Sequence, residues 1–213
     1  MDTDFSPEQL EQGRWLFTQS CDFMLGVARL GQLPESAMPE IAFCGRSNVG
    51  KSSLVNALTG RNTLAKTSNT PGRTQQINMF DLAQRLILAD LPGHGYAKAP
   101  VSVVEQWHRL INTYLRGRPE LRRVCFLIDS RHGIKDVDRE VMEMLDKAAV
   151  VYQVVLTKAD KISKTALDKC LEKTKADLQK NIAAHPEIVV TSSTKGLGLD
   201  TLRAHLAALA LPR

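Results

Sequence analysis

The chain has no apolar run long enough to cross a bilayer, and it has few cysteines and few aromatic residues. Its four cysteines are widely scattered with no metal-binding spacing, which favours a reduced, cytoplasmic protein. Aromatic residues make up 5% of the chain and do not alternate with basic ones, so no pattern supports stacking on single-stranded nucleic acid. The acidic start, Met1 to Asp4, is unlike a secretory signal. We therefore expect a protein that is neither secreted nor inserted in a membrane.

What the sequence does contain is an ordinary globular composition with a basic balance. Its 213 residues, 43% of them hydrophobic, are enough for one α/β domain with a substantial core. A net charge of +5 favours contact with polyanions. Arginines gather around Pro119, where they read equally well as an RNA contact or as a solvated surface: Arg116, Arg118, Arg122 and Arg123. The lysines between Ile162 and Ala184 are more typical of a solvated helix face.

The most informative stretch runs from Gly45 to Ser52 and reads GRSNVGKS, which fits the P-loop pattern G-x-x-x-x-G-K-[ST]. Glycine lets the backbone approach phosphate oxygens closely, and the following helix adds its positive N-terminal end. Lys51 offers a charge to the β- and γ-phosphates, and the Ser52 hydroxyl suits Mg²⁺. A buried-strand run, 41–44, precedes the motif and a helical pattern, 53–58, follows it. The context favours a nucleotide site over a simple helix-capping turn.

Three later motifs, each after an apolar run, indicate which nucleotide is bound. DLPG, at 90–93, places a carboxylate where it can hold a Mg²⁺-bound water, and a glycine N–H within reach of a γ-phosphate. TKAD, at 157–160, offers Asp160 to the N1–H and 2-amino groups of guanine. Adenine lacks both donors and would leave that carboxylate unpaired. SST, at 192–194, offers a backbone N–H to guanine O6. Together the motifs predict a guanine-nucleotide site.

Apolar runs alternate with helical patterns along the whole chain. A Ser cap, a Pro and a Gln begin a helix at Ser6 that we expect to reach Thr18. A strand is expected over 23–28, and further strands begin near Ile41, Asn78, Leu86, Val124, Val151 and Ile188. Further helices are expected over Ser52–Leu58, Val103–Leu115, Val137–Lys147, Thr165–Ala184 and Leu199–Leu209. This alternation predicts a mostly parallel, doubly wound α/β sheet with helices on both faces and the ligand at the carboxyl ends of its strands. We expect residues 1–38 to form an N-terminal extension, helix plus strand, packed on a nucleotide-binding domain of residues 39–213.

The ordered set GRSNVGKS, DLPG, TKAD and SST resembles the Ras-like P-loop GTPases. Longer strings resemble the EngB (YihA/YsxC) family, in the TrmE-Era-EngA-EngB-septin group: PEIAFCGRSNVGKSSLVNAL, TSNTPGRTQQINMF, DLPGHGYAKAP and LIDSRHGIKDVD. The resemblance implies a Ras-like fold and a slow, Mg²⁺-dependent enzyme that converts GTP to GDP and phosphate. It also implies a cytoplasmic monomer that acts on a large ribosomal subunit precursor, through rRNA or a ribosomal protein, and that normal cell-division septation needs.

The same resemblance implies a set of site residues. The nucleotide-binding positions are Gly45, Arg46, Ser47, Asn48, Val49, Gly50, Lys51, Ser52, Ser53, Gly72, Arg73, Thr74, Gln75, Asp90, Leu91, Pro92, Gly93, Thr157, Lys158, Ala159, Asp160, Thr191, Ser192, Ser193 and Thr194. Mg²⁺ would be held by Ser52 and Thr74, and by Asp90 through water, with Thr70 as the rival of Thr74. The loop from Arg61 to Gln76 corresponds to switch I and that from His94 to Ser102 to switch II. Catalytic roles fall to Lys51, Thr74 and Gly93, and His94 is a further candidate.

Two residues leave alternatives open. His94 stands where Ras has a water-orienting Gln and where EngB-like proteins usually have Tyr. It either orients the attacking water, as in translational GTPases, or replaces one aromatic-sized ring by another that points away. Asn48 matches a position where TrmE holds K⁺ beside the phosphates, or else it only stabilises the loop turn.

Two other functions compete with a GTPase switch. A P-loop kinase would need an acceptor pocket and a lid with catalytic arginines, and TKAD argues against it. A septin-like structural protein of division would need a second interface on its nucleotide face, for which the sequence shows no pattern.

Overall fold

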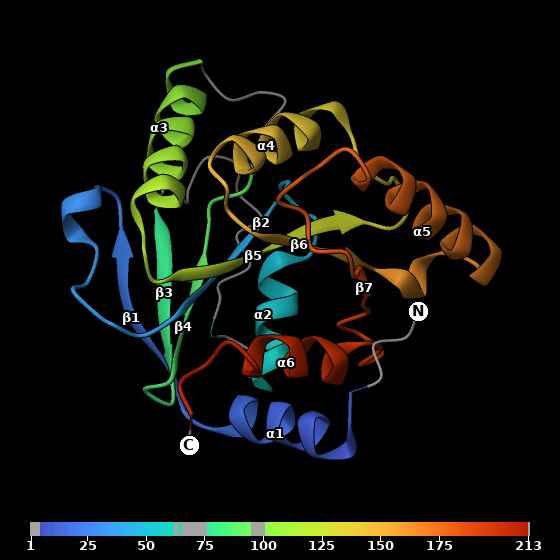
Figure 1. Ribbon diagram of the computed structural model, residues 1–213, viewed down its shortest axis with the longest axis horizontal. Helices are drawn as coiled ribbons and strands as arrows, with labels where there is room; N and C mark the ends of the chain where they lie inside the picture. Colours follow the sequence, from blue (N-terminus) through green and yellow to red (C-terminus); the bar gives the residue numbers. More distant parts are fainter. Residues whose placement is uncertain (1–4, 62–63, 65–75, 95–100, 213) are drawn as a thin grey trace.

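The computed structural model describes residues 5–61, 64, 76–94 and 101–212, which form one seven-stranded sheet with helices on both faces (Figure 1). The strands are β1 (Cys21–Val27), β2 (Glu40–Gly45), β3 (Ile77–Leu82), β4 (Leu86–Asp90), β5 (Leu121–Asp129), β6 (Tyr152–Thr157) and β7 (Val189–Val190). Their order across the sheet is β1-β3-β4-β2-β5-β6-β7. The pairs β1–β3 and β3–β4 are antiparallel, and all other pairs are parallel. The predicted mostly parallel, doubly wound sheet is confirmed.

The helices divide between the two faces of this sheet (Figure 1). They are α1 (Pro7–Thr18), α2 (Lys51–Thr59), α3 (Val101–Gly117), α4 (Asp136–Lys147), α5 (Lys164–Leu178) and α6 (Leu199–Ala207), with short 3₁₀ turns at Leu30–Gln32 and Ala159–Lys161. One core lies under α1, α2 and α6 and includes Leu16, Leu54 and Leu206. The other lies under α3, α4 and α5 and includes Ile111 and Leu145. The apolar runs inside four of these strands, 41–44 of β2, 86–89 of β4, 124–128 of β5 and 154–156 of β6, are buried throughout, as expected for segments covered on both faces.

The N-terminal segment contributes to the same sheet and core. Ser6 caps α1 as its sequence predicts: the N–H of Gln9 donates to Ser6 Oγ, and the N–H of Ser6 donates to Gln9 Oε1. Helix α1 packs closely on α6, where a Cβ at Gly13 would lie 2.7 Å from the backbone nitrogen of Ala204. Strand β1 extends the sheet beyond β3.

The helix expected over Thr165–Ala184 ends earlier, at Leu178. The residues after it are held by Asp146 of α4: Asn181 Nδ2 donates to Oδ2 at 2.6 Å, and the N–H of Ala183 donates to Oδ1 at 2.9 Å. Ala184 then pairs with Tyr152 as an isolated bridge beside β6. These tertiary contacts take the place of helical hydrogen bonds after Leu178. The predicted end of the helix at Ala184 was wrong because helical propensity does not include contacts with other elements.

The arginine cluster divides into buried and exposed members. Arg118 forms an ion pair with the fully buried Glu40, with Nη2 2.6 Å from Oε1, and also donates to the carbonyl of Pro34. Arg123 is half-buried and donates to Gln153. Arg116 and Arg122 are exposed. Only the last two are therefore placed to meet a polyanion.

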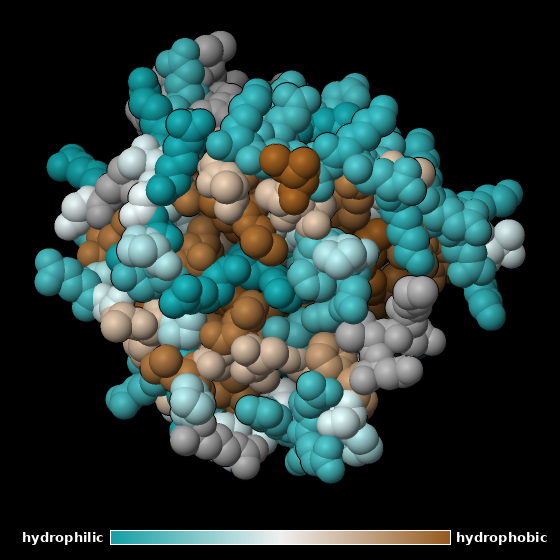
Figure 2. Space-filling model, in the orientation of Figure 1, coloured by the Kyte–Doolittle hydropathy of each residue, from teal (hydrophilic) through white to brown (hydrophobic). Residues whose placement is uncertain are grey.

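The surface over α4 and α5 is mainly hydrophilic (Figure 2). The predicted solvated face of α5 includes exposed lysines: Lys164, Lys169, Lys173 and Lys175. Among the described residues, no helix combines the length and the apolar character that crossing a membrane requires.

Candidate nucleotide-binding site

The P-loop connects the carboxyl end of β2 to the first turn of α2. Gly50 caps this helix with φ 105°, a backbone conformation that strains other residues, and Asn48 has φ 62°. A Cβ at Gly45 would lie 2.9 Å from Val49 Cγ1, so the loop folds tightly upon itself. The N-terminus of α2 therefore opens toward this loop, with Lys51 and Ser52 in its first turn.

The DLPG motif lies against the P-loop. Lys51 Nζ forms an ion pair with Asp90 Oδ1, and both side chains are largely buried. A Cβ at Gly93 would lie 3.1 Å from the backbone nitrogen of Ser47. The motif's glycine thus borders the loop that is predicted to hold phosphates, while Leu91 and Pro92 are buried behind it.

The TKAD motif meets the P-loop from the other side. Thr157 Oγ1 donates to the carbonyl of Val49 at 2.7 Å, and Lys158 Nζ donates to the carbonyl of Asn48 at 2.5 Å. Lys158 itself has φ 58°, which directs the chain into the short turn that carries Asp160. These contacts fix the predicted base-binding residues relative to the predicted phosphate-binding loop.

The SST motif supports the predicted base-reading carboxylate. Ser192 Oγ donates to Asp160 Oδ1 at 2.6 Å. This hydrogen bond lowers the pKa of Asp160, so the group is ionised at neutral pH. The backbones also join, since the N–H of Ala159 donates to the carbonyl of Thr191. Ser193 and Thr194 follow at the surface, and Ser53 is exposed on α2. The structure therefore brings all four sequence motifs into one continuous site.

Two carboxylates at this site were not predicted from the sequence. Asp129, at the end of β5, lies 3.0 Å from Lys158 Nζ and also binds Arg131. Burial alone would raise the pKa of Asp129, but hydrogen bonds from Arg131 and Lys158 outweigh it and hold that pKa well below the usual range. Asp138, in the first turn of α4, is fully buried beside Arg46 and His94. Both lie in LIDSRHGIKDVD, a string that carried the family resemblance.

His94 directs its ring away from solvent. Nε2 lies 2.9 Å from Asp138 Oδ1, and the ring stacks on Phe126 at 5.7 Å between centroids. Only 5% of the residue is exposed. In this arrangement the ring faces α4.

The residues present suit a magnesium ion. Mg²⁺ prefers hard oxygen ligands and is usually held by one or two protein side chains together with phosphates and water. Ser52 and Asp90 offer such oxygens at the edge of the P-loop. In the described part of the chain, no group of three or more His, Cys, Asp or Glu side chains could hold a metal by itself. The remaining predicted site residues, Gly72, Arg73, Thr74 and Gln75, lie outside the described residues, as do Thr70 and most of both predicted switch loops.

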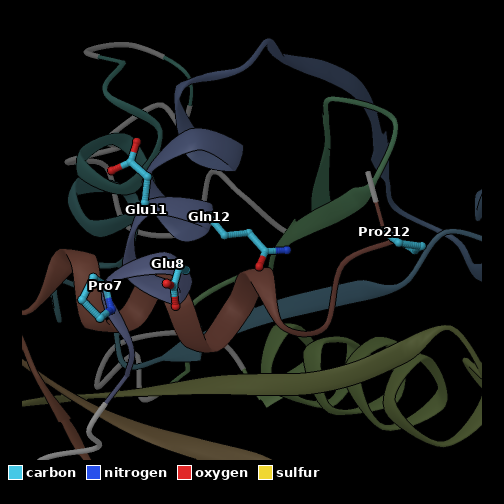
Figure 3. Close-up of a pocket in the computed structure, with 5 residues that line it drawn as sticks. All are labelled: Pro7, Glu8, Glu11, Gln12 and Pro212. Carbon is cyan, nitrogen blue, oxygen red and sulfur yellow. The ribbon is translucent and has the colours of Figure 1, made fainter.

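A separate open pocket lies at the start of α1 and contains none of the predicted site residues (Figure 3). Its lining is Pro7, Glu8, Glu11, Gln12 and Pro212. Two carboxylates in such a setting would repel a nucleotide, so the P-loop region remains the candidate site.

Comparisons with known proteins agree with this geometry. The family described as 50S ribosome-binding GTPase matches residues 40–158, and the elongation factor Tu GTP binding domain matches residues 111–211. A Rhodospirillum rubrum protein named probable GTP-binding protein EngB is 59% identical over 99% of this chain and 94% of its own length. A relative of the same name from Cereibacter sphaeroides is 54% identical over 93% of this chain and 92% of its own.

Two solved structures share the fold. The crystal structure of a probable GTP-binding protein EngB has a TM-score of 0.62 at 23% identity, and covers 80% of this chain and 97% of its own. Aquifex aeolicus Era bound to GDP and aluminium fluoride has a TM-score of 0.60 at 23% identity, and covers 83% of this chain and 57% of its own. The sequence relatives, the matched GTPase family and the four joined motifs lead to one conclusion: this chain belongs to the EngB family of Ras-like P-loop GTPases.

Proposed function

We propose that the chain binds GTP and GDP and slowly hydrolyses GTP with Mg²⁺, as a switch in assembly of the large ribosomal subunit that normal septation needs. The observation that carries the proposal is the contact chain through the four motifs: Asp90–Lys51, Val49–Thr157 and Asp160–Ser192. In this proposal the protein acts as a monomer in the cytoplasm.

The reaction would be in-line attack of water on the γ-phosphate. Lys51 would exchange Asp90 for phosphate oxygens, which offer it a stronger anionic partner. Ser52 and Thr74 would hold Mg²⁺, and Asp90 would hold one of its waters. Bound Mg²⁺ supplies positive charge to the phosphate oxygens. Slow turnover fits the position of Arg46, whose Nε lies 3.4 Å from the buried Asp138 and is therefore engaged inside the protein.

K⁺ beside the phosphates is part of the proposal and depends on Asn48. Its φ of 62° supports the turn-forming role, while its place inside the loop permits an amide oxygen to face a cation. We expect single-turnover GTP hydrolysis to be faster in KCl than in NaCl at equal ionic strength, by about tenfold if the cation offsets transition-state charge. Asn48→Ala should lose this difference and keep its affinity for GTP. Equal rates of the wild-type chain in both salts would leave Asn48 as a turn former only.

The ribosomal partner is proposed to meet the exposed arginines. The paired substitution Arg116→Glu/Arg122→Glu should weaken co-sedimentation with large-subunit precursors by at least about tenfold and reduce the salt slope by about 2, since each phosphate contact contributes about 0.9 to that slope. GTP binding should survive, because Arg122 lies where β5 pairs with the start of β2, whereas the P-loop follows the end of β2, and Arg116 lies in the last turn of α3, just before β5.

The matched control reverses two exposed cations elsewhere, Arg29→Glu/Lys147→Glu, so that net charge changes equally. Equal loss in both paired variants would mean that net charge alone matters. Unchanged ribosome binding in the first variant would show that Arg116 and Arg122 are ordinary solvated residues and not part of the ribosomal contact. Arg118 is left intact in this test because its loss would disrupt the buried pair with Glu40.

A further inference from the structure

Asp138 is a buried carboxylate that joins three parts of the site. It is fully buried in the first turn of α4, where the N–H of Lys135 donates to its Oδ2 at 2.9 Å. Arg46 Nε of the P-loop lies 3.4 Å from the same oxygen. His94 Nε2, directly after DLPG, lies 2.9 Å from Oδ1. A buried charge is expensive unless donors surround it, and here the donors come from three different segments.

These contacts determine which nitrogen of His94 carries its proton. A carboxylate only accepts hydrogen bonds, so the His94 Nε2 must be the donor. His94 Nδ1 then faces Cys44 Sγ at 3.9 Å. Burial raises the pKa of Cys44 to about 12, so this cysteine is a thiol that can donate to Nδ1. One hydrogen-bonded chain therefore runs from Cys44 through His94 to Asp138.

The backbone ties His94 to the P-loop as well. The N–H of His94 donates to the carbonyl of Gly45 at 3.2 Å, and the N–H of Ser47 donates to the carbonyl of His94 at 3.1 Å. Gly93 lies directly against Ser47. Gly93, whose N–H is expected to meet the γ-phosphate, is therefore followed directly by a residue that is held by its ring against α4 and by its backbone against the P-loop.

We propose that Asp138 is a positioning residue for GTP hydrolysis: it fixes His94 and Arg46 against α4, and His94 acts through this bond without contacting the attacking water. The proposal rests on the proposed function and assigns to His94 the task of placing Gly93 and the P-loop. The His94 ring is suited to holding its own segment in place, because it is hydrogen-bonded to Asp138, stacked on Phe126 and only 5% exposed.

The test compares His94→Phe, Asp138→Asn and the double variant in the full chain. Each single substitution should slow single-turnover hydrolysis at saturating GTP by about 3- to 10-fold, because sub-ångström misplacement is costly in phosphoryl transfer. The double variant should be within about twofold of the slower single variant, as expected for residues that act as one unit. GDP affinity should stay within about threefold of wild type in all variants. Asp136→Asn, an exposed carboxylate of the same helix turn, is the matched control and should hydrolyse GTP at the wild-type rate.

Histidine NMR at pH 8 gives a readout that does not depend on turnover. Wild-type His94 should be the Nε2–H tautomer. In Asp138→Asn the amide oxygen must face the N–H of Lys135, so the amide NH₂ faces His94 and should convert it to the Nδ1–H tautomer.

Several results would overturn the proposal. Near-complete loss of hydrolysis in His94→Phe beside a normal rate in Asp138→Asn would show that His94 acts on water directly. Additive losses, wild-type rates in both variants, or an Nδ1–H tautomer in the wild-type protein would also refute it. A wild-type chain that binds GTP but never hydrolyses it would refute the proposed function itself, and the NMR spectrum would still decide whether the Asp138–His94 bond exists.

Discussion

Replacing Asp160 by Asn should change the preferred nucleotide from GTP to xanthosine triphosphate. In the proposed function this carboxylate accepts from the N1–H and 2-amino groups of guanine, whereas an amide would set its NH₂ against the 2-amino group. Xanthine has an oxygen at C2 and therefore matches the amide. We expect GTP affinity to fall by about 10²- to 10⁴-fold, as when a site built for specific hydrogen bonds meets the wrong partner. Titration with fluorescent guanine and xanthine nucleotides measures the change.

The surroundings of Asp160 make this a clean substitution. The amide oxygen of Asn keeps an acceptor for the Ser192 hydroxyl, so the support from the SST motif is retained. Asp168→Asn, an exposed residue at the start of α5, removes the same charge away from the site and should leave GTP affinity unchanged. An Asp160→Asn protein that retains full preference for GTP would show that another group reads the base.

Glu40→Ala should unfold the protein at a much lower temperature. Glu40 is fully buried at the start of β2, where it accepts from Arg118 Nε at 2.9 Å and from the Tyr114 hydroxyl at 2.9 Å. Its removal takes away this acceptor of the buried Tyr114 hydroxyl and leaves the largely buried guanidinium with the Pro34 carbonyl and the more distant Glu120 carboxylate. Breaking a buried pair of this kind costs about 3–5 kcal/mol. For a domain of this size, that corresponds to a fall in Tm of about 10 °C.

Two further variants separate charge from packing. Glu40→Gln keeps an acceptor for Tyr114 and should cost less than Glu40→Ala. Glu35→Ala removes an exposed carboxylate from the preceding loop and should change the free energy of unfolding by less than about 0.5 kcal/mol. A loss of under about 1 kcal/mol for Glu40→Ala in urea unfolding would mean that the pair adds nothing over solvent.

The sheet and the nucleotide motifs were predictable because both are local patterns. Strands such as β4 and β6 contain short apolar runs, 86–89 and 154–156, and a nucleotide motif follows the end of each. The end of α5 was not predictable, since Asp146 stops that helix through contacts from a different element.

The roles of individual charged side chains could not be predicted from the sequence either. Arg118 is one of four clustered arginines in the sequence, yet Glu40, 78 residues away, binds it in the protein interior. Asp138 looks like an ordinary helix-start acid, and only the fold brings Arg46 and His94 to it. Long-range partners of polar side chains cannot be inferred from one sequence, whereas apolar periodicity and phosphate-loop spacing can.

The proposed function requires that this site hydrolyses GTP and distinguishes it from ATP. The most direct test is phosphate release from γ-labelled GTP and γ-labelled ATP by the full chain with Mg²⁺, alongside Lys51→Ala. We expect slow release from GTP, none above background from ATP, and none from either nucleotide with Lys51→Ala. Equal release from ATP and GTP, or unchanged GTP hydrolysis in Lys51→Ala, would refute the proposed function.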